Sequence, residues 1–439
     1  MFQKQDLQTV NASDIRKVLL VGYNGANNTG AEARLIVIIE EVRKVLGRDI
    51  EITIPAICGD NLRRYIKEEP KLRIAELPTV YFSALGRLVR ENDLILLTEG
   101  SCYMDTWSTY LLLAWLWVTW SAVKNGKLVV AYAVDSGNLS GLNQKLVRWV
   151  ASKTDLIITR TQAAADRLKT WKVSAPIAVT ADSAFLYHPE TADHDCLKRI
   201  WPEAASGVIG IAPVDFYLWP VIFRLWGSRK NCYRWPLYYT DSRKRRSARE
   251  ALAKGYARFA DRMIEKHGKP LAFICMEELD EPLARLIQSS MRHARETRIF
   301  SSREYNASQT TAILRSLDLL ITSRYHAGVL SLDAAVPQIA IGHDQRLRNL
   351  YRDLGIYDEY FLEHSSPQLF QTLEERVEYL LQNPLSQQEV LRKNIQIQHM
   401  RAKQTPELLA ELLSREVIPC MTRSSLRVPP VFLERRLRD

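Results

Sequence analysis

The side chains best suited to chemistry are concentrated in residues 317–347. An apolar run there ends in the sequence SRYH, and a second apolar stretch with helical character begins at about Ala327. An arginine can hold a carboxylate or a phosphate through two hydrogen bonds, and a histidine can pass on a proton near neutral pH. Arg324 and His326 therefore predict a site that binds an anion and transfers a proton, although a histidine that only stabilises the turn would have the same spacing.

Polar residues also follow other apolar runs. Asn24 and Asn28 lie in a segment rich in Gly and Asn between the first run and a helix, which suits an anion-binding loop and equally an ordinary turn. Asp105 follows the run LILLTEG, and we expect it at the start of the next helix, either as an N-cap or facing a cleft. Two cations also come just after buried runs, Arg160 after DLIIT and Arg346 after PQIAIG.

These residues need elements that bring them together, and the chain has the rhythm of an α/β protein. Short β-branched runs such as KVLLVGY and LVVAYAV alternate with longer amphipathic stretches, as expected for parallel sheets with buried strands. One series predicts a Rossmann-like, doubly wound domain over residues 15–188, and a second series predicts another over residues 206–365. Ligands of such sheets bind beyond the carboxyl ends of the strands, so we expect the two domains to face each other across a cleft.

The remaining segments limit the class of protein. Residues 366–439 are expected to form helices followed by a basic tail. The first residues are charged and lack a long apolar run, which argues against a secretory signal, and the six cysteines are scattered, which argues against a zinc site or a disulfide framework. We therefore expect a cytoplasmic protein without a bound metal.

The formal net charge of +10 is concentrated in one segment. Residues 216–249 hold nine Lys or Arg against one acid, together with nine aromatic residues, and their length beyond a normal connection indicates an insertion. Trp, Tyr and cations suit the headgroup region of an anionic membrane, and we prefer this interpretation to a nucleic-acid surface or a solvated loop. The uncharged stretch 106–123 contains four tryptophans and predicts a buried or interfacial helix rather than a membrane span.

Several of these motifs occur together, and in this order, in a known family. The sequence resembles the polysaccharide pyruvyl transferases in GYNGANNTGAEA, EGSCYMD, DLIITRTQAAADRL with TADSAF, and above all SRYHAGVLSLDAAVP with IGHDQRL. The resemblance covers most of residues 17–350. It implies a GT-B-like fold, in which two Rossmann-like domains enclose a cleft, with the acceptor on the N-terminal side and the donor on the C-terminal side.

The resemblance also implies a reaction. Phosphoenolpyruvate would give its three-carbon unit to two hydroxyls of a sugar, forming a pyruvate ketal and releasing phosphate, without a further cofactor. Arg324 and Arg160 match anion-binding arginines of the family, and His326 matches its catalytic acid. Asp105 matches an acid that orients or deprotonates a sugar hydroxyl.

The chain departs from the family pattern at one donor position. Many members carry an arginine after the first strand of the second domain, where this chain has Pro213 and Val214. Arg224 and Arg234 are the candidate replacements in the sequence.

The sequence thus predicts a transferase that acts on a surface polysaccharide or a lipid-linked glycan intermediate, at the inner face of the plasma membrane and without a nucleic-acid partner. Two alternatives stay open: a GT-B glycosyltransferase that uses a nucleotide sugar, and a non-catalytic scaffold that binds membrane or glycan through residues 216–249. The donor that supports activity would separate the two enzymes, and loss of activity in His326→Ala would argue against the scaffold.

Overall fold

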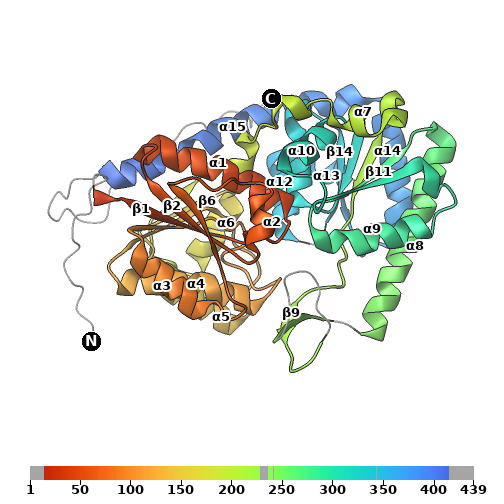
Figure 1. Ribbon diagram of the computed structural model, residues 1–439. Helices are drawn as coiled ribbons and strands as arrows, with labels where there is room; N and C mark the ends of the chain where they lie inside the picture. The colour runs from red at the N-terminus through yellow and green to blue at the C-terminus, as the bar shows by residue number, and fades with distance from the viewer. Residues whose placement is uncertain (1–13, 228–235, 241, 343, 415–439) are drawn as a thin grey trace, which may run out of the picture.

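The computed structural model describes residues 14–227, 236–240, 242–342 and 344–414 of the chain. Two parallel sheets, one from each half of the sequence, lie side by side with helices around them (Figure 1). The β-branched apolar runs form the strands because branched side chains pack well on a pleated surface that is buried on both faces.

The first sheet has seven parallel strands in the order β3-β2-β1-β4-β5-β6-β7. Their bounds are β1 Lys17–Val21, β2 Glu51–Ala56, β3 Leu72–Glu76, β4 Leu94–Leu97, β5 Leu128–Val134, β6 Leu156–Thr159 and β7 Ile177–Val179. The chain changes direction between β1 and β4, so the loops after these strands open a crevice at the carboxyl edge of the sheet. The apolar runs do not predict β3, because its residues alternate between buried and more exposed positions at the edge of the sheet.

Helices cover both faces of the first sheet. Their bounds are α1 Thr29–Leu46, α2 Gly59–Arg63, α3 Phe82–Glu91, α4 Thr109–Lys124, α5 Gly141–Ala151 and α6 Gln162–Thr170. One apolar cluster packs α1 on the sheet and another packs α3, α4 and α5 on the opposite face, above and below the sheet in Figure 1. The Trp-rich helix α4 buries Leu112, Trp115 and Val118 in the second cluster. No helix in the described ranges is long and apolar enough to cross a membrane.

The second sheet has six parallel strands in the order β12-β11-β8-β13-β14-β15. Their bounds are β8 Ile209–Ala212, β11 Leu271–Cys275, β12 Thr297–Ser301, β13 Leu319–Thr322, β14 Gln338–Gly342 and β15 Phe361–Glu363. Its direction changes between β8 and β13, as that of the first sheet does between β1 and β4. Both sheets are therefore doubly wound in the Rossmann manner.

The helices of the second half surround this sheet. Their bounds are α7 Cys196–Ile200, α8 Arg243–His267, α9 Glu281–Ser289, α10 Ala307–Arg315, α11 Tyr325–Ser331, α12 Gln345–Asp353, α13 Tyr357–Tyr360, α14 Leu369–Gln382 and α15 Pro384–Ser414. A two-stranded antiparallel hairpin, β9 Val221–Phe223 and β10 Leu237–Tyr239, lies between β8 and α8. Helix α8 begins at Arg243, so the basic end of segment 216–249 forms about the first two turns of a helix.

Helix α15 crosses from the second domain to the first, along the upper edge in Figure 1. Leu391 and Ile395 pack in the core of the second domain, whereas Leu409 and Leu413 pack in the α1 cluster of the first. Between them, Thr405 donates from Oγ1 to Oγ1 of Thr180 at 2.8 Å. The last helix thus joins the two domains on the face away from the hairpin.

Candidate active site

A pocket opens where the crevices of the two sheets meet. Its cavity volume is about 70 Å³, and it opens into a wider space of about 480 Å³ that includes solvent at the mouth. The lining residues are Tyr23, Asn28, Glu99, Ser101, Trp107, Leu111, Trp115, Trp219, Glu277, Arg324 and Arg346. The loops after β1, β4, β8 and β13 contribute to this wall, and these are the strands at which both sheets change direction. Ligands of doubly wound sheets bind at this place.

Arg324 is held at the pocket wall by two carboxylates of the second domain. It follows β13 as the N-cap residue of α11. Its Nε donates to both oxygens of Asp280 at 2.9 and 3.1 Å, and its Nη1 donates to Oε2 of Glu277 at 3.0 Å. The guanidinium is therefore fixed in one orientation, because its planar fork matches the geometry of a carboxylate.

Glu277 is a buried carboxyl group that binds its proton tightly. Its residue is 2% exposed, and burial raises the pKa of Glu277 to about 7 against the opposing attraction of Arg324. Oε2 accepts from Arg324 and, across the domain interface, from Nδ2 of Asn28 at 3.4 Å. The buried Oε1 has no hydrogen-bond partner within the described part of the chain. A carboxyl group of this kind can exchange a proton at a pocket wall near neutral pH.

Arg346 brings a second cation to the pocket. Two of its nitrogens donate to Oδ2 of Asp344 at 2.8 and 3.1 Å. Its guanidinium carbon lies 4.8 Å from the ring centroid of Trp107 in the first domain. Trp107 in turn makes an edge contact with Trp219, with 4.9 Å between ring centroids. An edge-to-face pair of rings and a cation thus join the two domains along this wall.

Glu99 shapes the first-domain side of the pocket. Its carboxylate accepts from the backbone N–H of Tyr23 at 3.2 Å and from the backbone N–H and Oγ of Ser101 at 3.1 and 2.7 Å. Asn28 caps α1 by accepting from the backbone N–H of Ala31 at 3.1 Å. These bonds fix the two loops that follow β1 and β4.

His326 lies outside the lining of this pocket, where α11 meets α1. A Cβ atom on Gly30 would stand 2.2 Å from atoms of the His326 side chain, so the ring packs directly on the first turn of α1. Its Nε2 is 3.5 Å from Oδ2 of Asp182. Burial lowers the pKa of His326, and the carboxylate of Asp182 opposes this shift. His326 and Arg324, two apart in the sequence, therefore have different surroundings.

Arg160 is the centre of a buried ion network at the domain interface. The residue is 2% exposed, and it donates to Asp135 at 3.0 Å and to Asp182 at 2.5 Å. The ring of Tyr325, from the second domain, lies 4.2 Å from the guanidinium. Burial would raise the pKa of Asp182, but Arg34 and Arg160 hold it well below its usual range. Arg160 is thus surrounded by protein carboxylates and does not line the pocket, and its role in anion binding stays a prediction.

Asn24 and Asp105, also predicted at the site, bind elements of the first domain. Nδ2 of Asn24 is buried and donates to the carbonyl of Pro55 at 3.1 Å. Oδ2 of Asp105 accepts from the backbone N–H of Ser140 at 2.9 Å and from Nδ2 of Asn143 at 2.7 Å, which fixes the start of α5. Neither residue lines the pocket.

The expected position of Asp105 at the start of the following helix is wrong. Helix α4 begins at Thr109, and the side chain of Ser108 caps it. Serine and aspartate are equally good N-cap residues, so the sequence alone does not distinguish a helix capped by Asp105 from one capped by Ser108. Arg224, a candidate replacement for the missing donor arginine, follows β9 and does not line the pocket, while Arg234 lies outside the described residues.

Comparison with known proteins identifies the family. The model of the polysaccharide pyruvyl transferase family matches residues 27–345, which is most of the chain. The chain belongs to this family. No curated protein sequence matches it significantly.

Solved structures share the fold of this family member. UDP-GlcNAc 2-epimerase from Neisseria meningitidis, bound to UDP-GlcNAc, aligns with a TM-score of 0.60 at 11% identity over 90% of this chain and 99% of that one. UDP-GlcNAc 2-epimerase from Methanocaldococcus jannaschii gives 0.54 at 12% identity over 83% and 92%. A glycosyltransferase from Rickettsia africae gives 0.53 at 11% identity over 91% and 99%. At these identities the similarity shows the fold alone, and it confirms the predicted GT-B-like pair of Rossmann-like domains.

Sequence reasoning missed several charged residues of this pyruvyl transferase family member. Glu277 comes just after the strand β11. The criterion that selects Arg160 and Arg346, a charged residue directly after a buried strand, also selects Glu277. Asp182 lies in the motif TADSAF but has no distinctive spacing. Arg34 stands among apolar residues of α1, and only the folded structure shows that it faces Asp182 at 3.4 Å.

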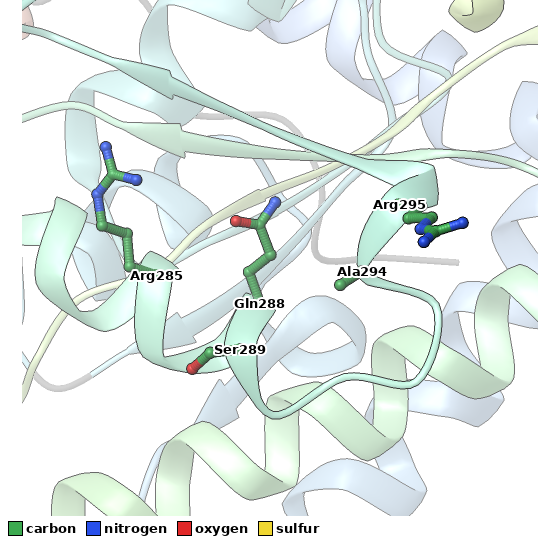
Figure 2. Close-up of a pocket in the computed structure, with 5 residues that line it drawn as sticks. All are labelled: Arg285, Gln288, Ser289, Ala294 and Arg295. Atoms are coloured by element: carbon green, nitrogen blue, oxygen red, sulfur yellow. The ribbon is translucent and has the colours of Figure 1, made fainter.

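A second hollow on this transferase lies beside α9, and it shares no residue with the cleft pocket. Figure 2 shows Arg285, Gln288 and Ser289 on the helix and Ala294 and Arg295 on the turn that follows. None of these five residues is buried. The hollow is therefore an open surface without the desolvated polar groups of the cleft.

In the described ranges, no three His, Cys, Asp or Glu side chains are grouped as in a metal site. The four cysteines that the structure describes, Cys58, Cys102, Cys196 and Cys275, are free thiols. The expectation that the reaction needs no metal stays a prediction.

Proposed function

We propose that this protein transfers a pyruvate ketal from phosphoenolpyruvate to a sugar of a surface polysaccharide or a lipid-linked glycan intermediate, with release of phosphate. The observation that carries the proposal is the cleft pocket in a member of the pyruvyl transferase family, where cations of the second domain face aromatic and acidic residues of the first. The two ligand types that the reaction needs, an anion and a sugar, fit the two sides of this pocket.

The donor would bind on the second-domain side. Phosphoenolpyruvate carries a carboxylate and a phosphate, and Arg324 and Arg346 are the arginines that line the pocket. Each is oriented by a carboxylate of its own domain, so the guanidinium groups are in place before the ligand arrives. Neither occupies the position, at Pro213 and Val214, where many members of the family carry an arginine.

The acceptor would bind on the first-domain side. The half-buried ring of Trp107 can cover part of the apolar face of a sugar, and the carboxylate of Glu99 can accept hydrogen bonds from its hydroxyls. We assign the acceptor to this wall because the donor arginines stand opposite it.

The proposed reaction has balanced steps. A proton is added to the methylene carbon of phosphoenolpyruvate, which becomes a methyl group, and the neighbouring carbon becomes electrophilic. One sugar hydroxyl attacks this carbon and loses its proton. The bond to the phosphate oxygen then breaks, and the second hydroxyl attacks the same carbon and loses its proton. Two carbon–oxygen bonds form, one breaks, and phosphate leaves with the remaining proton.

We assign the proton donor to His326 and the proton acceptor to Glu277. The lowered pKa of His326 makes its imidazolium form a readier donor, and Asp182 supports that form. Glu277 has the pKa of a general base near neutrality and lines the pocket, whereas Asp105 does not. His326 would have to reach the donor through a change in the contact between α1 and α11, since the ring packs on Gly30.

The proposal includes the place of action. A polysaccharide precursor on a lipid carrier would be met at the inner face of the plasma membrane by a cytoplasmic enzyme that binds there peripherally. The basic and aromatic segment 216–249 supports a membrane partner rather than a nucleic acid.

The test is release of inorganic phosphate from phosphoenolpyruvate by the purified protein with a glycolipid extract of membranes. We expect release that depends on the extract and is lost in Arg324→Ala and His326→Ala, while the exposed control Arg285→Ala keeps it. No release, in protein shown to bind phosphoenolpyruvate, would overturn the proposal. Sugar transfer from a nucleotide sugar in the same extract would point to a glycosyltransferase instead.

A further inference from the structure

Large apolar side chains are exposed at the end of strand β9. The exposed fractions are 51% for Phe223, 65% for Leu225 and 78% for Trp226. Arg224 lies among them. Single exposed apolar residues are ordinary, but three in four consecutive positions, one of them a tryptophan, form a patch that water solvates poorly.

Helix α5 presents a second patch of the same composition. Leu142 is 78% exposed and Trp149 is 55% exposed. They are seven residues apart, which is about two turns, and so lie on the same face of α5. Lys145 lies between them and is exposed, and Lys153 just beyond the helix places its ammonium 5.6 Å from the ring centroid of Trp149. The opposite face of α5 packs Val147 and Val150 in the core.

The two elements that carry these patches lie on the same side of the molecule. The hairpin is bound to the first domain, because the backbone N–H of Val221 donates to the carbonyl of Trp107 at 2.9 Å. The rings of Phe223 and Tyr110, the second residue of α4, are tilted to each other with 6.5 Å between their centroids. In Figure 1 the hairpin and α5 lie along the lower edge, on the side away from α15.

Cations lie on the elements that carry these patches and on the helix that follows the hairpin. Helix α8 begins with RKRR and has no acid in its first turn, and Arg243 and Lys244 are exposed. Helix α5 and the described parts of the hairpin contain no acidic residue. In an anionic bilayer, exposed apolar and aromatic side chains can enter the boundary of the hydrocarbon region while neighbouring cations bind the lipid headgroups. A soluble protein partner would not require this combination of side chains.

We propose that the exposed patches on the β9 hairpin and on α5 together form a docking surface for an anionic lipid bilayer. Leu225, Trp226, Leu142 and Trp149 enter the headgroup region, and the cations between them meet lipid phosphates. Trp107, which binds the hairpin, and Trp219 also line the pocket, so docking brings the cleft to the membrane. The inference rests on the proposed function only in explaining why docking is useful, which is access to a lipid-linked acceptor. Binding to the bilayer does not depend on catalysis.

The experiment is cosedimentation of the full chain with vesicles of phosphatidylcholine alone and with added phosphatidylglycerol. We expect binding to the anionic vesicles that weakens with salt. Leu225→Ser with Trp226→Ser, and separately Leu142→Ser with Trp149→Ser, should weaken it at least tenfold. The matched control is Leu385→Ser with Met400→Ser, two residues of α15 that are 62% and 61% exposed; it should bind like the wild type.

Equal binding of the wild type and both patch variants, or no binding to anionic vesicles, overturns the inference. Arg243→Gln with Lys244→Gln supplies an independent variant outside both apolar patches, and it should reduce binding and its salt dependence. These vesicles contain no glycan and no phosphoenolpyruvate, so binding can succeed while phosphate release fails. Conversely, phosphate release with a detergent-soluble acceptor should be unchanged in the patch variants.

Discussion

At the scale of single residues, the cleft is notable for carboxylates that hold its arginines. Arg324 is bound by Asp280 and Glu277, so an anionic donor meets a cation that already has partners. Protonation of Glu277 would remove one of the competing charges, and its pKa of about 7 places that event near neutrality. Anion binding and proton transfer are therefore expected to be linked at this residue.

Glu277→Gln should lose activity while keeping the fold. If Glu277 accepts the hydroxyl proton, wild-type kcat at saturating phosphoenolpyruvate should rise with pH as this carboxyl group, whose pKa is about 7, loses its proton. The variant should lose roughly 100-fold or more in kcat, together with this rising limb. The pH profile of phosphate release measures both effects.

The neighbouring variant Glu278→Gln is the control, since this residue does not line the pocket. It should keep the wild-type profile. A rising limb that persists in Glu277→Gln would assign the base to another group.

Arg160→Gln should act mainly on stability. Removing one partner of a buried ion pair costs about 3–5 kcal/mol, because Asp135 and Asp182 would stay buried without their cation. Urea unfolding should show this loss, while Arg285→Gln on the surface of α9 should change stability by less than about 1 kcal/mol. A normal unfolding curve with a raised KM for phosphoenolpyruvate would instead support the predicted role in anion binding.

At the scale of elements, the first turn of α1 decides where His326 can lie. Glycine at position 30 lets α11 approach so closely that the imidazole occupies the space of a missing side chain. The same turn is capped by Asn28, which also reaches Glu277 of the other domain. One helix start thus contacts both proposed proton-transfer residues.

Gly30→Ala should displace His326 and reduce kcat, because the added Cβ would stand 2.2 Å from the ring atoms. The control is Gly141→Ala at the start of α5, where an added Cβ meets nothing within 4 Å. The control should keep activity and gain up to about 1 kcal/mol from better helix propensity. The pKa of His326, followed by NMR, should change in the first variant alone, and an unchanged pKa with full activity would contradict this account.

At the scale of the whole molecule, buried carboxyl groups should make stability depend on pH. Burial raises the pKa of Glu32 to about 8 and those of Glu41 and Glu277 to about 7. A raised pKa in the folded state means that folding favours the protonated form. This contribution is fully present below the unfolded pKa of about 4.5 and is lost as the pH rises through 7 to 8.

The free energy of unfolding should therefore fall by a few kcal/mol between pH 5.5 and pH 8.5. Denaturant titrations at the two pH values measure the difference. Glu32→Gln should reduce it, since an amide does not titrate, and Glu250→Gln on the exposed face of α8 should leave it unchanged. Stability that is equal at both pH values would show that these carboxyl groups are solvated.

Local pattern predicted much of this architecture because buried parallel strands are continuous apolar runs. The strands beginning at Lys17, Leu128 and Leu319 are such runs, and the candidate residues Asn24 and Arg324 come soon after two of them. Continuous apolar runs do not predict strand β3, because an edge strand alternates between buried and exposed residues. The sequence pattern does not predict the hairpin either, because its strands have only three residues each and are too short to show a periodic pattern.

By itself the sequence determined the family, the doubly wound class of both domains and the motif that holds Arg324 and His326. These follow from order along the chain. Only the tertiary structure decided that Arg324 reaches the pocket, that Arg160 is neutralised by Asp135 and Asp182, and that Glu277 belongs to the site. The physical reason is that a charge takes its role from the partners and the solvent around it, and these come from segments far apart in the sequence.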